Sequence, residues 1–296
     1  MVNSFKSYHP IVNFTYFAFV IVFNMIFMNP ICLAISLISS FAYSIMAGKS
    51  KALKFNIGFI VPIILIAIIV NPLFSHEGIT ILGYLPSGNP ITKESILYGV
   101  GTGIMLGSVI CWFSCYNLIM TSDKFIYIFG RITPSLSLIL SMVLRFVPLF
   151  KQRLKAISNS QKAIGKDISQ GSIIQRAKNG LNILSIMITW SLENAIETSE
   201  SMKSRGYGLK GRTAFSIYTM DYRDKRELIL MLILGGYIIA GSILGGIDFT
   251  YYPSTSPIKI DLFSVSIYTA YLLLCITPII IEGREELKWK YLKSRI

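Results

Sequence analysis

Six apolar runs, each near the length needed to cross a bilayer, constrain the fold of this chain more than any other feature of its sequence. They cover residues 11–28, 31–47, 57–74, 95–120, 228–247 and 262–281. A hydrocarbon core about 30 Å thick requires roughly 17 to 25 helical residues per crossing. Because 53% of the residues are hydrophobic and only 15% are charged, we expect an all-α, polytopic membrane protein with about six transmembrane helices.

The basic residues are concentrated in alternate loops between these runs. Lysines lie between the second and third runs and at the C-terminus, and the segment 121–227 has 17 Lys and Arg against 8 Asp and Glu. In contrast, residues 73–90 contain no Lys or Arg, and residues 248–261 contain only Lys259. Cytoplasmic loops carry such an excess of cations. The sequence therefore predicts a multi-pass cell-membrane protein with both termini in the cytoplasm, and the net charge of +13 indicates topology rather than nucleic-acid binding.

Residues that catalysis, cofactor binding or metal binding would need are sparse. His9 and His76 are the only histidines and fall on opposite sides of the expected membrane, which disfavours a His-based metal site or a Ser–His relay. Gly48-Lys49-Ser50 resembles the end of a phosphate-binding loop, but Tyr43 replaces its first glycine. All four cysteines fall within the apolar runs, which disfavours a disulfide framework. We expect no enzyme activity, no cofactor and no nucleotide site in this chain.

The segment 121–227 is a long insert between the fourth and fifth runs, and it keeps helical periodicity. An apolar stretch over 134–150 is followed by a basic helix over 151–162, and glycines at 165 and 171 mark a break. Ser172 suits the N-cap of a second helix, which we expect to end at Ser204 because Gly206 suits the left-handed residue after a helix. We therefore divide the chain into a membrane domain (1–120), cytoplasmic or interfacial helices (121–227) and a second membrane domain with a basic tail (228–296).

Two further patterns indicate packing surfaces. The fourth run carries a small-residue seam that permits close approach of another helix, formed by Gly99, Gly103 and Gly107. Internal packing is the favoured interpretation of this seam, and contact with another subunit is the alternative. The second insert helix has an apolar face built from residues spaced by three and four, including Leu181, Leu184 and Ile188. Core packing and contact with a partner protein explain this face equally well.

Several short motifs are distributed over nearly the whole chain. His9-Pro10 and Asn29-Pro30 flank the first run, and the middle of the chain contains residues 123–127, Arg131, Pro134 and residues 144–148. The most diagnostic motif is Met202-Lys203-Ser204-Arg205-Gly206-Tyr207-Gly208 with Gly211-Arg212-Thr213, and a terminal motif covers residues 285–292. Together these motifs resemble those of the transmembrane T component of energy-coupling-factor transporters.

This resemblance implies a non-catalytic subunit that transmits the ATP-driven movement of two ABC-type ATPases to a small membrane protein that binds the substrate. ATP and Mg²⁺ would be bound by those ATPases, and the imported cargo would be a vitamin or a transition-metal ion. The segment 121–227 would contain the coupling helices of the family. Contact with the substrate-binding subunit is then expected at apolar residues such as Leu181, Leu184 and Ile188.

In that family, two Arg-centred motifs end the coupling helices and dock into the ATPases. The second motif corresponds to Ser204, Arg205 and Gly206. The best match to the first motif is Ala163, Ile164 and Gly165, in which Ile164 replaces the arginine. An apolar contact at this position, a contribution from Lys162 or Lys166, or two non-identical ATPases would each accommodate the difference.

Two other functions compete with the coupling role. An intramembrane enzyme would need clustered polar residues at membrane depth, which the apolar runs do not contain. A stand-alone secondary transporter is expected to have two repeated halves with interrupted helices, whereas four runs, an insert and two runs do not form similar halves. The coupling subunit is therefore the leading interpretation, and a secondary transporter is the alternative.

Overall fold

The computed structural model describes residues 4–84, 86, 88–166, 168–169, 171–209 and 218–293. Contacts within the chain define two units, one formed by residues 1–125 and 218–296 (the membrane unit) and the other by residues 126–217 (the helical arm). The Gly211-Arg212-Thr213 part of the diagnostic motif lies outside the described residues. The division of the chain at residues 120 and 227 by function stays a prediction.

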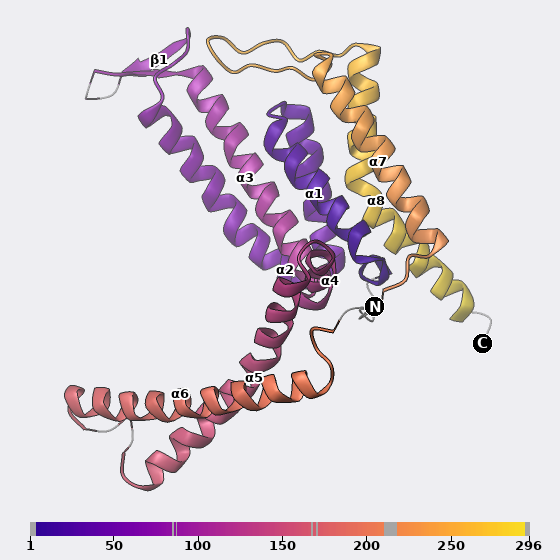
Figure 1. Cartoon of the computed structure of the whole chain (residues 1–296). Coiled ribbons are helices and arrows are strands. Elements are labelled where there is room, and N and C mark those ends of the chain that lie inside the picture. The colour runs from indigo at the N-terminus through magenta and orange to yellow at the C-terminus, as the bar shows by residue number, and fades with distance from the viewer. Residues whose placement is uncertain are drawn as a thin grey trace. The chain divides into compact units, whose positions relative to one another are not determined.

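The membrane unit is a bundle of helices (Figure 1). Its helical elements are η1 (Ser4–Ser7), α1 (Pro10–Ile26), α2 (Pro30–Phe74), α3 (Lys93–Ile119), α7 (Tyr222–Ile243) and α8 (Leu262–Lys293). Both α1 and α2 begin at a proline, whose missing N–H has no partner to lose in the first turn of a helix. The side chains of His9 and Asn29 accept hydrogen bonds from the N–H groups of Ile11 and Ile31, which caps these two helices.

Five helical segments of the described residues are long and apolar enough to cross a bilayer: 30–48, 56–74, 93–119, 222–243 and 262–293. α1 has 17 residues, at the lower end of the spanning range. The predicted all-α, polytopic architecture is thereby confirmed. The fifth expected run differs in its bounds, because α7 begins at Tyr222 rather than near residue 228. The Asp224 carboxylate accepts a hydrogen bond from the Asp221 N–H at 3.4 Å, which supports this earlier start.

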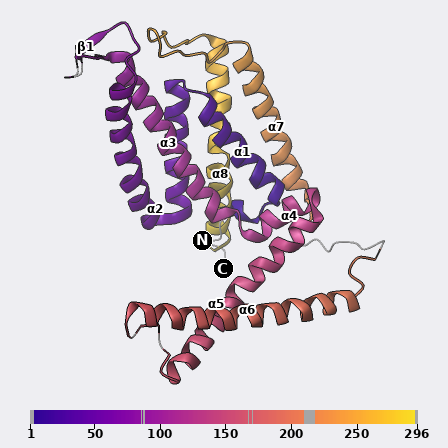
Figure 2. The ribbon, with the colours of Figure 1, turned by 60° about the vertical axis from the view of Figure 1, so that its left-hand side comes forward.

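α2 includes both the second and the third expected spans. In a straight helix, Ser44 and Asn56 would lie about 18 Å apart along the axis. However, the Asn56 Nδ2 donates a hydrogen bond to the Ser44 Oγ at 2.8 Å. The chain therefore reverses direction between the limbs 30–48 and 56–74, as Figures 1 and 2 show.

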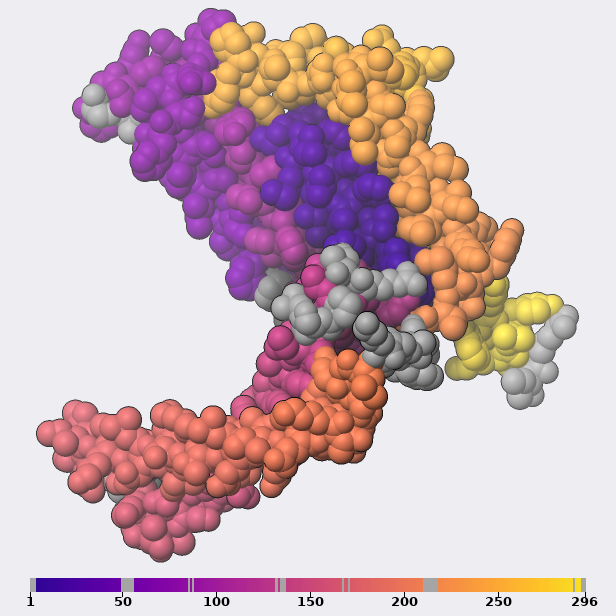
Figure 3. Space-filling model, viewed as in Figure 1, coloured from indigo at the N-terminus to yellow at the C-terminus, as the bar shows by residue number. Residues whose placement is uncertain are grey.

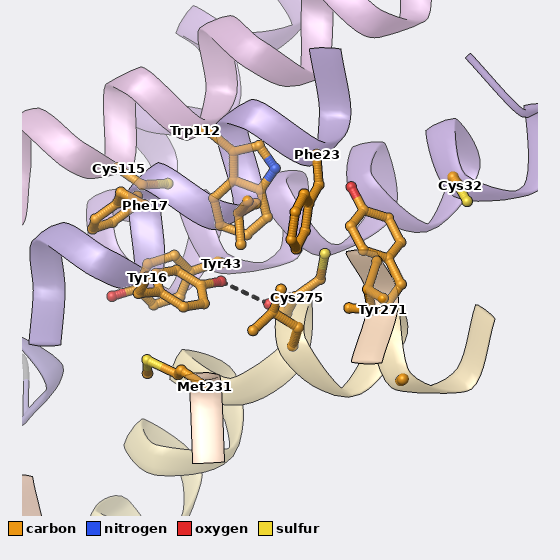
Figure 4. Close-up of a cluster of buried hydrophobic side chains, with 14 of the residues drawn as sticks. Tyr16, Phe17, Phe23, Cys32, Tyr43, Trp112, Cys115, Met231, Tyr271 and Cys275 are labelled. Atoms are coloured by element: carbon orange, nitrogen blue, oxygen red, sulfur yellow. Dashed lines mark hydrogen bonds between the residues drawn. The ribbon is translucent and has the colours of Figure 1, made fainter. Parts of the chain in front are cut away.

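Aromatic and sulfur-containing side chains form the core of the membrane unit (Figure 4). Tyr16, Tyr43 and Trp112 are fully buried, and the Trp112 ring lies 5.9 Å from that of Tyr16 and 6.5 Å from that of Tyr43. The Tyr16 hydroxyl donates to the Cys275 carbonyl at 2.9 Å, and the Trp112 indole N–H donates to the Ser36 Oγ at 3.0 Å. These buried polar groups are thus satisfied within the core.

A short antiparallel hairpin connects α2 to α3, with strands β1 (Ile81–Tyr84) and β2 (Pro90–Thr92). The sequence did not predict this hairpin, since strands of four and three residues carry almost no periodic signal. The Lys93 N–H donates to the Thr80 carbonyl at 3.0 Å and thereby ties the hairpin to the start of α3.

The helical arm contains α5 (Pro134–Ala163) and α6 (Ile173–Ser204), and α4 (Ser122–Ile132) leads into it. α5 continues through Pro148, so the apolar stretch and the basic helix expected from the sequence form one helix. α6 begins as the sequence predicts, because the Ser172 side chain accepts a hydrogen bond from the Gln175 N–H at 3.3 Å.

Candidate functional site

α5 and α6 cross and pack against each other within the helical arm (Figures 2 and 3). At the crossing, the rings of Phe150 and Trp190 lie edge to face with centroids 5.5 Å apart, and the Arg153 guanidinium lies 5.4 Å from the centroid of the same indole. Each kind of contact contributes about 0.5–1.5 kcal/mol. From Trp190, α6 continues for about 21 Å to its C-terminal end.

The second Arg-centred motif forms the C-terminal cap of α6. The helix ends at Ser204, Arg205 occupies the cap position with φ −84° and ψ 10°, and Gly206 has φ +74°. The Gly206 N–H donates to the carbonyl three residues earlier, and the next N–H donates to the carbonyl five residues earlier, both at 3.0 Å. This pair of hydrogen bonds is a Schellman motif, which places a left-handed residue after the cap and therefore favours glycine.

The end of α5 has the same backbone arrangement. Ala163 is its last helical residue, Ile164 occupies the cap position with φ −95° and ψ 16°, and Gly165 has φ +78°. The Gly165 N–H donates to the carbonyl three residues earlier at 3.0 Å, and the Lys166 N–H donates to the carbonyl five residues earlier at 2.9 Å. The two triplets matched from the sequence are therefore equivalent in backbone geometry.

The cap side chains distinguish the two ends. Arg205 and Ile164 are both exposed, and Ile164 keeps 63% of its surface open to solvent. A guanidinium offers five N–H donors and a permanent charge, whereas an isoleucine offers only apolar surface. The two caps thus present the same scaffold with different contact chemistry.

Arg205 also lines a groove of about 700 Å³ between α5 and α6. The charged side chains of this groove are Arg145, Glu197 and Arg205. Its other walls are built from Leu138, Ser141, Met142, Phe146, Leu149, Asn194, Thr198, Ser201, Met202 and Tyr207. The sequence did not predict this groove, because only the helix crossing brings the two arginines, which are far apart in the sequence, to one surface.

The apolar face expected on the second insert helix is open. Leu181, Leu184 and Ile188 have exposed fractions of 67%, 57% and 50%, whereas Ile183 and Asn179 on the same helix are buried. Contacts among the described residues therefore leave this face mostly uncovered, and core packing does not account for its apolar character.

The glycine seam of α3 packs against α2. A Cβ atom at Gly99 would lie 2.8 Å from the Ala67 carbonyl oxygen, and one at Gly103 would lie 2.9 Å from the Ile64 Cα. A Cβ at Gly107 would meet an isoleucine side chain of α2 at 3.1 Å. Only glycine allows these two helices to approach so closely, so the seam packs within the chain.

The side chains that could bind a metal ion do not cluster into a site among the described residues, and the cysteines are buried. The described residues contain no group of three or more His, Cys, Asp or Glu side chains that could hold a metal ion. The four cysteines are free and buried: Cys32, Cys111, Cys115 and Cys275. The described residues instead leave two helix ends and an apolar helix face exposed.

Together, these features define a multi-pass, all-α membrane protein that carries a pair of crossed, exposed helices. The chain belongs to the CbiQ family of cobalt transport proteins, whose sequence profile matches residues 3–215. Two segments that carry the site, α5 and α6, fall within this match.

Relatives of the chain include three proteins named energy-coupling factor transporter transmembrane protein EcfT. The one from Bacillus selenitireducens is 26% identical over 243 residues, which cover 76% of this chain and 88% of the relative. The one from Lactobacillus helveticus is 40% identical over 106 residues, covering 35% of this chain and 38% of the relative. The one from Streptococcus equi is 35% identical over 104 residues, covering 35% and 39%. The chain thus aligns with most of the Bacillus protein but with less than half of the other two.

Proposed function

We propose that this chain is the energy-coupling transmembrane subunit of an ABC-type importer in a prokaryotic cell membrane, with both termini in the cytoplasm. Membership of the CbiQ family, the names of its relatives and the five apolar helices of spanning length support this role. The cation-rich alternate loops support the orientation. Its imported cargo is a vitamin or a transition-metal ion, which a separate subunit binds.

The observation that carries the proposal is the pair of equivalent caps at the ends of α5 and α6. Each cap presents one exposed side chain after the last helical turn, where it can enter a groove on another protein. Arg205 pairs with carboxylates or carbonyl oxygens of one ATPase, since a guanidinium makes strong, directed hydrogen bonds with such acceptors. Ile164 makes an apolar contact with the other ATPase. ATP and Mg²⁺ are held by these partners, and this chain has no catalytic role.

The crossing at Trp190 makes α5 and α6 suitable for transmitting movement. Contacts with Phe150 and Arg153 hold the two helices together, so approach of the ATPases displaces them as a rigid body. The open face at Leu181, Leu184 and Ile188 binds the substrate-binding subunit. Displacement of the helices then reorients that subunit and releases its cargo inside the cell.

Affinity purification of the tagged full chain in mild detergent tests this function. We expect two ATPase subunits and one small membrane protein to co-purify, and the reconstituted complex to import its cargo only with hydrolysable ATP. A chain that purifies without ATPases and transports a solute by itself would contradict the coupling role and favour a secondary transporter.

A further inference from the structure

The polypeptide passes between the membrane unit and the helical arm twice, at residues 125–126 and 217–218. On the side of the membrane unit, both passages lie beside residues 4–9 (the N-terminal segment). In Figure 1, the indigo start of the described chain lies close to the start of α4 and to the beginning of α7, as the contacts of Lys124 and Arg223 with this segment require. The passage at 125–126 (the outgoing link) and the passage at 217–218 (the returning link) are therefore both held in part by contacts with the N-terminal segment.

The outgoing link is held by Lys124, which lies in the first turn of α4 and is only 4% exposed. Its Nζ donates to the backbone carbonyls of Lys6 at 2.5 Å and Tyr8 at 3.3 Å. The Asn13 amide, in the orientation that satisfies its neighbours, accepts a third hydrogen bond from this Nζ at 2.6 Å and donates to the Phe5 carbonyl at 3.1 Å. A lysine ammonium has three donors, and all three are used here.

The returning link contacts the same segment. The ring of Tyr218 lies edge-on to that of His9, with centroids 6.4 Å apart. The Arg223 guanidinium lies 4.1 Å from the centroid of the Tyr8 ring, and its Nη2 donates to the Ser7 Oγ at 3.2 Å. Both links are therefore attached to the four consecutive residues 6–9 that precede α1.

The N-terminal segment is itself fixed in the core of the membrane unit. Phe5 is fully buried, and its ring lies 5.3 Å from Tyr16 and 6.4 Å from Tyr43. His9 caps α1 by accepting a hydrogen bond from the Ile11 N–H at 3.3 Å. Any force applied to the N-terminal segment is consequently applied to α1 and to the aromatic core.

Packing alone does not explain the burial of Lys124. An apolar side chain would fill the same space without the unfavourable removal of an ammonium group from water. Burial and the nearby Lys6 ammonium lower the pKa of Lys124 to about 8, an effect that the Asp224 carboxylate opposes, so the charged form predominates at pH 7. Its three directed hydrogen bonds fix the first turn of α4 at one position, which an apolar contact would not do.

We propose that Lys124 is a positioning residue which, with Arg223, fixes both links on the N-terminal segment. Displacement of α5 and α6 then reaches α1 instead of being absorbed by bending of the links. Packed side chains, hydrogen-bond networks and rigid secondary elements carry such coupling between distant sites. This inference rests on the proposed coupling function and adds to it the point at which movement enters the membrane unit.

The test uses the full complex of this chain with its ATPases and substrate-binding subunit, reconstituted in proteoliposomes. Lys124→Met removes the three donors and keeps an unbranched side chain, whereas Arg223→Ala removes the contacts with Tyr8 and Ser7. Lys225→Met replaces an exposed lysine in the same turn of α7 and is the matched control. Cargo uptake and ATP hydrolysis are measured in the same vesicles, and their ratio reports the coupling.

We expect Lys124→Met to retain both ATPases and to hydrolyse ATP while uptake per ATP falls about tenfold. Arg223→Ala should give a smaller fall, and Lys225→Met should give none. An unchanged ratio in both variants, or uptake and hydrolysis that fall in parallel, would overturn the positioning role. If the Lys124→Met chain does not assemble with its partners, the ratio of uptake to ATP hydrolysis is measured with Arg223→Ala alone. An unchanged ratio in that variant would then overturn the positioning role. A wild-type chain that binds no ATPase would instead overturn the proposed function itself.

Discussion

The C-terminal ends of α5 and α6 have the same backbone and different side chains. Each helix closes with a Schellman motif and a glycine of positive φ, but the cap residue is Ile164 in α5 and Arg205 in α6. The backbone of the cap is set by local hydrogen bonds and by glycine. In the proposed complex, the contact with each ATPase depends on the exposed cap side chain. The proposed function therefore predicts two docking points of equal geometry and unequal chemistry.

The largest expected effect on ATPase binding is at the C-terminal end of α6, where the cap residue is Arg205. Arg205→Glu reverses the charge of the proposed ATPase contact, and we expect ATPase retention in a pull-down to fall by at least about 30-fold, since breaking a desolvated charge pair costs roughly 2–5 kcal/mol. Lys203→Glu places the same carboxylate in the same turn, on another exposed residue, and should lower retention much less. Equal losses in the two variants would contradict a specific contact at Arg205.

A substitution at the crossing of α5 and α6 should destabilise both helices. Trp190→Ala removes the contacts with Phe150 and Arg153, which together contribute about 2 kcal/mol. Hydrogen exchange measured by mass spectrometry should therefore accelerate in α5 and in α6. Trp190→Phe retains an aromatic ring and should restore most of the protection. Faster exchange in only one helix would show that the two ends do not share a scaffold.

A single substitution gives the cap of α5 the same side chain as the cap of α6. Ile164→Arg places a guanidinium on the cap of α5, and we expect ATPase retention to fall about tenfold, because the proposed apolar contact would then remove a charged group from water without a partner, at a cost of roughly 1–3 kcal/mol. Ile164→Met keeps an apolar side chain and should leave retention unchanged. Identical binding by both variants and the wild-type chain would argue against a contact between position 164 and an ATPase.

The smallest expected effect distinguishes the two glycines. Alanine at either position is strained because φ is positive, at a cost of about 1 kcal/mol. At Gly206, the new Cβ would also lie 3.1 Å from the Leu209 Cδ1, whereas at Gly165 it would enter open space. Gly206→Ala should therefore loosen its helix end more than Gly165→Ala does, as measured by hydrogen exchange of the last turn. The asparagine variants, which tolerate the left-handed conformation, should be milder at both ends.

Local chemistry made the helix ends predictable from the sequence. Ser172 and Gly206 act within one turn of the residues they cap, so their roles follow from neighbouring residues alone. The glycine seam of α3 could be predicted for a similar reason, because Gly99, Gly103 and Gly107 lie on one helix face. These features required no knowledge of which helices meet.

Features that depend on distant contacts could not be predicted in the same way. Lys124 lies in a basic segment and would be expected to face water, but carbonyl groups of residues 6 and 8 surround its ammonium. The groove that contains Arg145 and Arg205 exists only because α5 crosses α6. In both cases the relevant partners are distant in the sequence, and no periodic pattern indicates them.

Cross-linking at the two helix ends is the most direct test of the docking of both ends to ATPases. The native cysteines are buried, so a thiol-reactive photo-cross-linker can be directed to Ser204→Cys or Ala163→Cys, with Lys178→Cys near the other end of α6 as the control. We expect Ser204→Cys and Ala163→Cys to cross-link to ATPase subunits in the active complex. The Lys178→Cys control should cross-link to no ATPase subunit. An active complex in which neither helix end reaches an ATPase would contradict the proposed docking.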